Sequence, residues 1–295
     1  RRHRAVTHYG TPYRFSTMLR TVRSFALLVS LLVSFGCGSD VQPADPSLVQ
    51  SERSLVDVGY MTGVTVDEHG QPFLLTRDGG LLEEVDGAWT IRFRARTGAT
   101  FEDVVSLGEG RFALTTIDMG FELDVATGEL TQHFCYLPDD DIREEDPPQT
   151  PVPTSELARA VTFDHETGLL YAQPQTVQQT DGVGTFSEVA SFDRVTGTEL
   201  EFRNLGDASF SAGGMVVLSR GDAGTTLLAA DGSMLHTIVF ETGAKRAVLD
   251  LSSLGIEDVA GMAIDSGRGV LHVLDQRGTR PMHIALDLEL LRAEL

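Results

Sequence analysis

Cysteine and tryptophan are scarce in this sequence. Cys37 and Cys135 are the only two cysteines, and Trp89 is the only tryptophan. If Cys37 carries a modification, no intramolecular disulfide can form and the core alone must hold the fold together. Cys135 lies in the apolar run FCYL, where a buried, unreactive thiol is expected. A single tryptophan gives little support to an aromatic platform that stacks on sugars.

Basic residues are also few. The chain has 23 Lys and Arg against 43 Asp and Glu, and its first 36 residues hold six arginines and no acid. The remainder therefore has 17 basic and 43 acidic residues, a formal charge of −26. Such a chain repels nucleic acid and anionic lipid, so we exclude both as ligands. A cationic ligand is compatible with this charge, although a solvated acidic surface is the simpler interpretation.

Motifs of several common enzyme classes are missing. The sequence contains no G-x-S-x-G, no H-E-x-x-H and no C-x-x-C. Histidines in strand runs are more often structural than metal ligands, so we predict no catalytic residue and no metal ligand from them. After residue 36 the histidines are His69, His133, His165, His236, His272 and His283.

The N-terminal region resembles an export signal. Residues 1–17 precede Met18 and are interpreted as an over-long translation start. Residues 18–36 have the parts of a signal peptide, with two arginines and then an apolar stretch of about a dozen residues. That stretch is too short for a transmembrane helix, which needs about 20 residues.

The segment ends at Gly36-Cys37, which resembles the lipobox of bacterial lipoproteins, so we predict a lipid on Cys37. Ser34 stands where the lipobox usually has Leu, and this leaves ordinary signal cleavage nearby as an alternative. Gly38 follows the cysteine in place of an aspartate that would favour inner-membrane retention, so the outer membrane is expected. Residues 37–50 are predicted to be a tether, with the lipid as the contact to the membrane.

The rest of the chain, residues 51–295, predicts an all-β domain. Short runs rich in Val, Leu, Ile, Phe and Thr alternate with Gly, Asp and Asn clusters. Five similar runs each precede a tight turn and a second strand, at a spacing of about 40 to 57 residues. A repeated four-stranded antiparallel unit at this period is typical of β-propeller blades. The five opening runs are 61–67, 101–108, 158–164, 211–219 and 259–265.

This pattern predicts a five-bladed propeller, or a six-bladed one if residues 170–210 contain a degenerate blade. Residues 48–58 are expected to add a strand to the last blade and close the ring. Gly63, Gly214 and Gly261 lie in opening runs, where backbones converge, so larger residues there should destabilise the fold. Three D-x-x-T-G segments, at residues 124, 164 and 193, predict hairpin turns.

One long acidic segment, residues 138–154, separates the second and third blades. Its six carboxylates could gather around calcium, but their spacing does not match the Asp-x-Asp-x-Asp-Gly calcium loop. A mobile solvated loop is the preferred interpretation.

The segments MTGVTVDEHGQPFLLTRDGGLLEEVD, FEDVVSLGEGRFALTTID and VAGMAIDSGRGVLHVLD are similar to the SdiA-regulated family of bacterial propeller proteins. The similarity runs from about Tyr60 to Leu288. It implies a propeller whose opening strands carry acidic residues toward the channel, as in lactonase-type and phytase-like propellers that hold a divalent cation. Glu102 matches such a position, whereas Thr62, Arg159 and Ala260 occupy the comparable places. One glutamate is far from the six to eight oxygens that calcium prefers.

Two functions follow as hypotheses. The first is a non-enzymatic binding or scaffold module of the cell envelope, whose partner is an unidentified protein or small molecule. The second is a calcium-assisted hydrolase of lactones or phosphate esters. Under either hypothesis the ligand is expected at the channel mouth, near Glu102, Asp103, Arg159, Asp207 and Asp258. An Arg159–Glu102 pair would replace a metal there, so no cofactor is predicted, with calcium as the alternative.

Overall fold

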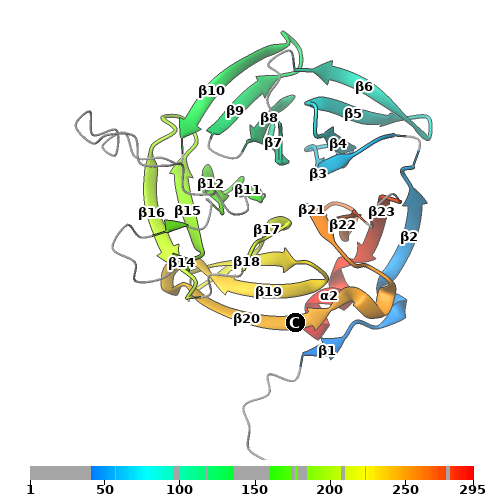
Figure 1. The fold of residues 1–295 in the computed structure, drawn as a ribbon, viewed down its shortest axis with the longest axis vertical. Helices are drawn as coiled ribbons and strands as arrows, with labels where there is room; N and C mark the ends of the chain where they lie inside the picture. The colour runs from blue at the N-terminus through cyan, green and yellow to red at the C-terminus, as the bar shows by residue number, and fades with distance from the viewer. Residues whose placement is uncertain are drawn as a thin grey trace, which may run out of the picture. The chain divides into compact units, whose positions relative to one another are not determined.

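Figure 1 shows the computed structural model of the chain. It describes residues 41–56, 58–95, 100–116, 119–135, 160–173, 177–178, 185–206, 210–222, 224–276 and 280–295. All of the described residues belong to one compact unit, Val41–Leu295. Cys37, the signal segment, Arg159, Asp207 and the acidic segment 138–154 lie outside the described residues. No described helix is both long and apolar enough to cross a membrane.

The Val41–Leu295 unit is a five-bladed β-propeller, and each blade has a four-stranded antiparallel sheet (Figure 1). The first blade contains β3 (Met61–Val66), β4 (Pro72–Thr76), β5 (Gly80–Val85) and β6 (Ala88–Arg94). The second contains β7 (Asp103–Gly108), β8 (Arg111–Thr115), β9 (Met119–Asp124) and β10 (Glu129–Cys135). The third contains β11 (Val161–Asp164), β12 (Leu169–Ala172), β15 (Glu188–Asp193) and β16 (Glu199–Asn204).

The fourth blade contains β17 (Gly214–Gly221), β18 (Gly224–Asp231), β19 (Met234–Val239) and β20 (Ala244–Asp250). The fifth contains β21 (Val259–Asp265), β22 (Val270–Asp275), β23 (Met282–Asp287) and β2 (Val49–Ser54). A separate two-stranded pair, β13 (Val177–Gln178) and β14 (Thr185–Phe186), lies between β12 and β15 in the sequence. The prediction of five blades is therefore confirmed, because the strands described within residues 170–210 are β12, β15 and β16 of the third blade and the short β13–β14 pair, which is not a four-stranded blade.

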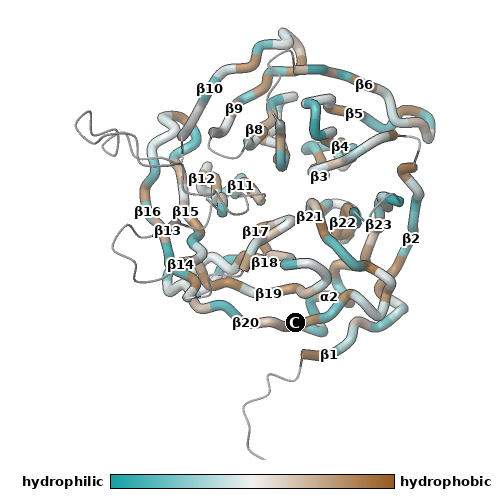
Figure 2. The backbone as a smooth tube through the Cα atoms, in the orientation of Figure 1, coloured by the Kyte–Doolittle hydropathy of each residue, from teal (hydrophilic) through white to brown (hydrophobic). Residues whose placement is uncertain are grey.

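The innermost strands line the centre of the ring. In cyclic order β3, β7, β11, β17 and β21 each contact both neighbours. Residues on both faces of β3, β7, β11 and β21 are mostly buried, because each inner strand packs between two others, whereas β17 is buried at its start and exposed at its end. The outer strands β2, β6 and β16 are largely exposed, and Figure 2 shows the hydrophilic colouring along β2. The hydrophobic core thus lies between the blades, and the more polar outer strands lie at the periphery of the ring, exposed to solvent.

The N-terminal strand closes the ring, as the sequence predicts. β2 pairs antiparallel with β23, with Glu52 opposite Ile284. Just before it, β1 (Gln42–Pro43) pairs parallel with β20, and the 3-10 turn η2 (Pro46–Leu48) buries Leu48 completely. The predicted tether over residues 37–50 is therefore wrong from Gln42 onward. The two prolines and several polar residues of this segment favour a tether, and no sequence pattern indicates that β1 pairs with β20 or that Leu48 is buried.

Within the described part of the chain, the other helical segments are short, namely η4 (Phe240–Thr242), η5 (Leu251–Leu254) and α2 (Leu288–Glu294). The D-x-x-T-G segments form hairpin turns, as predicted. Asp124 Oδ1 accepts hydrogen bonds from Ala126 N at 2.8 Å and Thr127 N at 3.1 Å. Gly128 follows at φ 73°, a conformation that favours glycine. The turns at residues 164–168 and 193–197 end in the same way.

Candidate functional site

The predicted channel-mouth residues precede or begin the inner strands. The structure places Glu102 and Asp103 in the interior, with Asp103 only 1% exposed, whereas Asp258 is exposed before β21. Asp258 N donates to Asp275 Oδ1 at 2.9 Å, and Glu257 N donates to the same oxygen at 3.1 Å. Asp275 is fully buried and holds this turn, a role that its strand position in the sequence does not reveal.

Asp103 acts as a link between blades. Its Oδ1 accepts from Val104 N at 2.8 Å, and its Oδ2 accepts from Val161 N at 2.9 Å on the third blade. Burial raises the pKa of the Asp103 carboxyl well above its ordinary value, and the nearby charge of Glu102 adds to this. Both oxygens are thus engaged by the backbone of two inner strands, which favours a structural role for this residue. Among the described residues, no three His, Cys, Asp or Glu side chains are grouped so that they could hold a metal ion.

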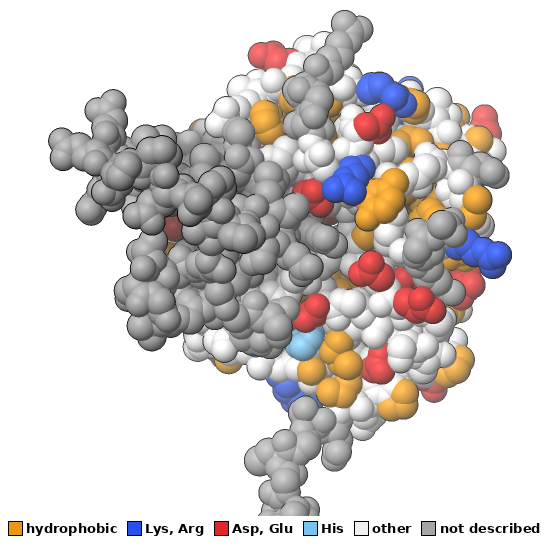
Figure 3. All heavy atoms as spheres, in the orientation of Figure 1, with side chains coloured by type: hydrophobic (Ala, Val, Ile, Leu, Met, Phe, Trp, Pro, Cys, Tyr) orange, Lys and Arg blue, Asp and Glu red, His pale blue; other side chains and the backbone are white. Residues whose placement is uncertain are grey.

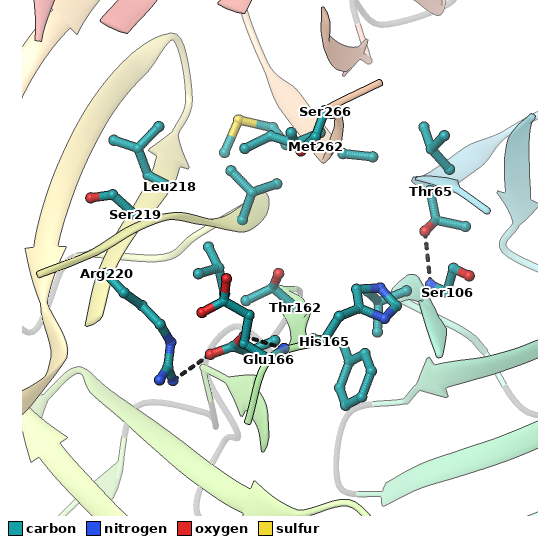
Figure 4. A pocket seen from close by; sticks show the side chains of 18 of the residues that line it. Thr65, Ser106, Thr162, His165, Glu166, Leu218, Ser219, Arg220, Met262 and Ser266 are labelled. Atoms are coloured by element: carbon teal, nitrogen blue, oxygen red, sulfur yellow. Dashed lines mark hydrogen bonds and ion pairs between the residues drawn. The ribbon is translucent and has the colours of Figure 1, made fainter. Parts of the chain in front are cut away.

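A pocket opens at the other end of the inner strands, where each blade makes its first hairpin turn. We call it the channel-end pocket. Its volume is about 410 Å³, and all five inner strands contribute to its lining. Polar residues include Thr65, Ser106 and Thr162, and Ser106 N donates to Thr65 Oγ1 at 2.8 Å. Figure 4 shows side chains from several blades converging on this space.

Asp164 and Arg220 both line the channel-end pocket and form an ion pair. Figure 4 labels Arg220 at one side of this space. Asp164 ends β11 of the third blade and is 4% exposed, and Arg220 comes from β17 of the fourth blade. The same carboxylate accepts from Thr167 Oγ1 at 2.8 Å, and Arg220 Nη2 donates to Thr167 Oγ1 at 3.0 Å. A turn aspartate thus binds a guanidinium from the next blade. The sequence pattern around Asp164 predicts the turn. It gives no indication that Asp164 contacts an arginine 56 residues later in the chain.

His165 and Glu166 lie beside this pair in the turn after β11 (Figure 4). The His165 ring packs edge-on against Phe163, with the ring centroids 4.7 Å apart. Partial burial lowers the pKa of His165, although the charges of Asp164 and Glu68 oppose this shift. The imidazole is therefore neutral at pH 7 and can donate or accept a hydrogen bond.

A second pocket, which we call the turn pocket, lies between the first hairpin turns of the first and fifth blades. Its volume is about 510 Å³, and it shares His165 and Ser266 with the channel-end pocket. Asp67, Glu68 and Asp265 bring acidic groups to it, and Arg268 brings a basic one. The two pockets are contiguous, so together they form one polar site with its carboxylates supplied by hairpin turns.

A histidine pair, with one ring buried and the other half-buried, lies deeper in the fifth blade. His272 Nδ1 and His283 Nε2 are 2.9 Å apart, and the two rings are stacked with an interplanar angle of 8°. Burial lowers the pKa of His272 to about 4 and that of His283 to about 3, with the positive charge of Arg53 contributing to the second shift. The sequence places both residues in one blade but does not show that they touch.

Comparisons with known proteins identify the fold. No family model matches the chain, and no curated protein matches it significantly. The solved glutaminyl cyclase of Myxococcus xanthus has a TM-score of 0.52 at 14% identity, over 81% of this chain and 95% of that one. A nidogen/laminin complex has a TM-score of 0.49 at 13% identity, over 78% of this chain and 76% of that one. A gluconolactonase from Xanthomonas campestris has a TM-score of 0.48 at 13% identity, over 77% of this chain and 72% of that one. The likeness to the glutaminyl cyclase, at 14% identity, supports the propeller fold alone.

Proposed function

We propose that this chain is an exported, lipid-anchored β-propeller of the bacterial envelope, which works as a non-enzymatic binding module. Its ligand site is the pair of contiguous pockets at the turn end of the channel. The observation that carries the proposal is the lining of the channel-end pocket by all five inner strands, with fixed polar groups such as the Asp164–Arg220 pair. A concave site with a few convergent polar groups is the usual form of a small-molecule site.

The export part rests on the sequence. The arginine-containing start, the short apolar stretch and Gly36-Cys37 support cleavage before Cys37 and acylation of its thiol. The propeller itself is acidic and, on the face shown in Figure 3, carries described acidic side chains interspersed with apolar and basic ones. Such a surface suits an exposed domain that stays soluble next to its anchor.

Lipid attachment is tested by labelling. In a bacterial host fed radiolabelled palmitate, the wild-type chain should incorporate label and fractionate with the outer membrane. Cys37→Ala should abolish the label, whereas Cys135→Ala should keep it, because Cys135 lies in β10 of the propeller. Label that persists in Cys37→Ala would contradict lipid attachment at Cys37. Label that is lost in Cys135→Ala would assign the lipid to Cys135 instead.

Ligand binding is tested by blocking the site. Ser266 is exposed in the turn after β21 and lines both pockets, so Ser266→Trp should fill them with little effect on the core. We expect saturable melting shifts from at least one class in a panel of amines, amino acids, dicarboxylates and monosaccharides. Ser266→Trp should abolish that shift.

The matched control is Ala126→Trp, which places the same side chain in the exposed β9–β10 turn. If the ligand-induced melting shift is unchanged in Ser266→Trp, the ligand binds outside the two pockets. Hydrolysis of a lactone or phosphate ester by the purified chain, dependent on added calcium, contradicts the non-enzymatic assignment.

A further inference from the structure

Three blades end their inner strand in an aspartate, and these residues are equivalent in the repeat. They are Asp67 after β3, Asp164 at the end of β11 and Asp265 at the end of β21. Each uses Oδ1 within its own turn: Asp67 accepts from Gln71 N at 2.8 Å, Asp164 from Glu166 N at 2.9 Å, and Asp265 from Arg268 N at 3.0 Å. Their second oxygens are therefore left for other partners.

The second oxygens differ in what they bind. Asp164 Oδ2 holds the Arg220 guanidinium. Asp265 Oδ2 is buried without a hydrogen-bond partner, because Arg268 Nη1 lies 3.6 Å away and donates to Gly70 O at 2.7 Å instead. For Asp67, no Lys or Arg nitrogen among the described residues lies within ion-pair distance.

The two incompletely paired carboxylates face one space. Asp67 and Asp265 both line the turn pocket, and Glu68 lines it beside them. The turns are adjacent: a Cβ built on Gly70 would lie 2.8 Å from Asp265 Oδ2. Asp265 is 4% exposed, so its Oδ2 is a buried polar atom without a hydrogen-bond donor, and such atoms normally require one. Arg268 covers it with a side chain that is 62% exposed and attached to the site by one backbone hydrogen bond.

We propose that the turn pocket binds an organic cation, an ammonium or guanidinium group, between Asp67 and Asp265. The proposal rests on the proposed function, because it names the ligand class of that same site. The chain itself supplies the template, since Asp164 already holds a guanidinium at the equivalent position of the third blade. A ligand cation donates to Asp67 and, as Arg268 swings aside, to Asp265 Oδ2. His165 is neutral and adds no repulsion.

The experiment is a titration of the whole chain, purified in mild detergent, with agmatine, which carries one guanidinium and one ammonium. We expect saturable binding by calorimetry. Asp67→Asn keeps the Oδ1 acceptor of the turn and removes the charge, so it should weaken agmatine about ten-fold or more. Asp124→Asn is the matched control, because Asp124 makes the same kind of turn in the outer β9–β10 hairpin.

Several results would overturn the proposal. The first is the absence of saturable binding heat with agmatine. The second is equal agmatine affinity in Asp67→Asn and wild type. The third is the same saturable heat when sodium chloride of equal ionic strength replaces agmatine. Calcium that binds where agmatine does not would also overturn it. If succinate binds instead and Ser266→Trp blocks it, the binding module stands and the cation assignment fails. Agmatine that binds equally well to Ser266→Trp and Asp67→Asn defeats both proposals.

Discussion

Gly261→Ala should destabilise the propeller by about 2–3 kcal/mol, and Gly261→Val by more. A Cβ on Gly261 would lie 2.7 Å from Val64 N and 2.9 Å from Gly63 Cα, both on the neighbouring inner strand β3. These are backbone atoms, so the contact is relieved only by moving the first and fifth blades apart. The usual small gain from replacing a strand glycine with alanine cannot offset this clash.

Equilibrium urea unfolding of the variants measures the effect. Gly221→Ala is the matched control, because Gly221 ends the inner strand β17 and its Cβ would meet nothing within 4 Å. We expect the control to stay within about 0.5 kcal/mol of wild type. Gly63→Ala and Gly214→Ala should resemble Gly261→Ala, since their Cβ atoms would approach backbone atoms to 3.0 Å and 2.7 Å. Neutral results at all three positions would contradict the convergence of inner strands.

The convergence explains why the fold could be predicted from the sequence. Five runs of small and apolar residues, each followed by a turn and further strands at a period of about 40 to 57 residues, are typical of blades that pack into a closed ring and bury both faces of the inner strands. The pairing of β2 with β23 follows from the same need, because an open last blade would expose a strand edge. β1 could not be predicted from the sequence, because a parallel strand of two residues that contains Pro43 is too short to show an alternation of apolar and polar residues.

The candidate site could be predicted only in part. The acidic residue Asp103 suggested a ligand at the channel mouth, but two backbone N–H groups from different blades engage its oxygens. The turn aspartates were recognised as hairpin residues, and this is correct. Their further contacts depend on the ring: Asp164 meets Arg220 from the next blade, and Arg268 meets Gly70 across 198 residues. Local sequence patterns contain no signal for such pairs.

The stability of the propeller should fall steeply as the pH drops from 7 to 5, largely because of His272 and His283. His272 is buried and His283 is half-buried against it, and their pKa values in the folded state, about 4 and about 3, lie below the ordinary 6.5. Between pH 6.5 and about 4 the unfolded chain therefore binds protons that the folded chain does not. Each histidine lowers the free energy of unfolding by about 1.4 kcal/mol per pH unit in that window.

From pH 7 to pH 5 the pair should remove about 3–4 kcal/mol from the free energy of unfolding. Burial is the main cause of both shifts. Around His283, the charges of His272 and then Arg53 lower the pKa further. Around His272, the charge of Asp265 opposes the shift and the weaker influence of Arg268 adds to it. Asp103 has a raised pKa, so its contribution to stability increases as the pH falls, but it is common to every variant compared.

The measurement is urea unfolding at pH 7 and pH 5 for wild type, for His272→Gln/His283→Gln and for His69→Gln. The double variant has no imidazole to protonate in this blade, so its loss of stability between the two pH values should be much smaller than that of wild type. His69 is 81% exposed at its side chain, so His69→Gln should keep the wild-type loss. If the double variant folds too weakly, His283→Gln alone should remove about half of the loss, since one of the two titrating rings is then gone. An equal loss in wild type and in these variants would show that the stacked rings are not held neutral, because protonating them in the folded state would then cost nothing extra.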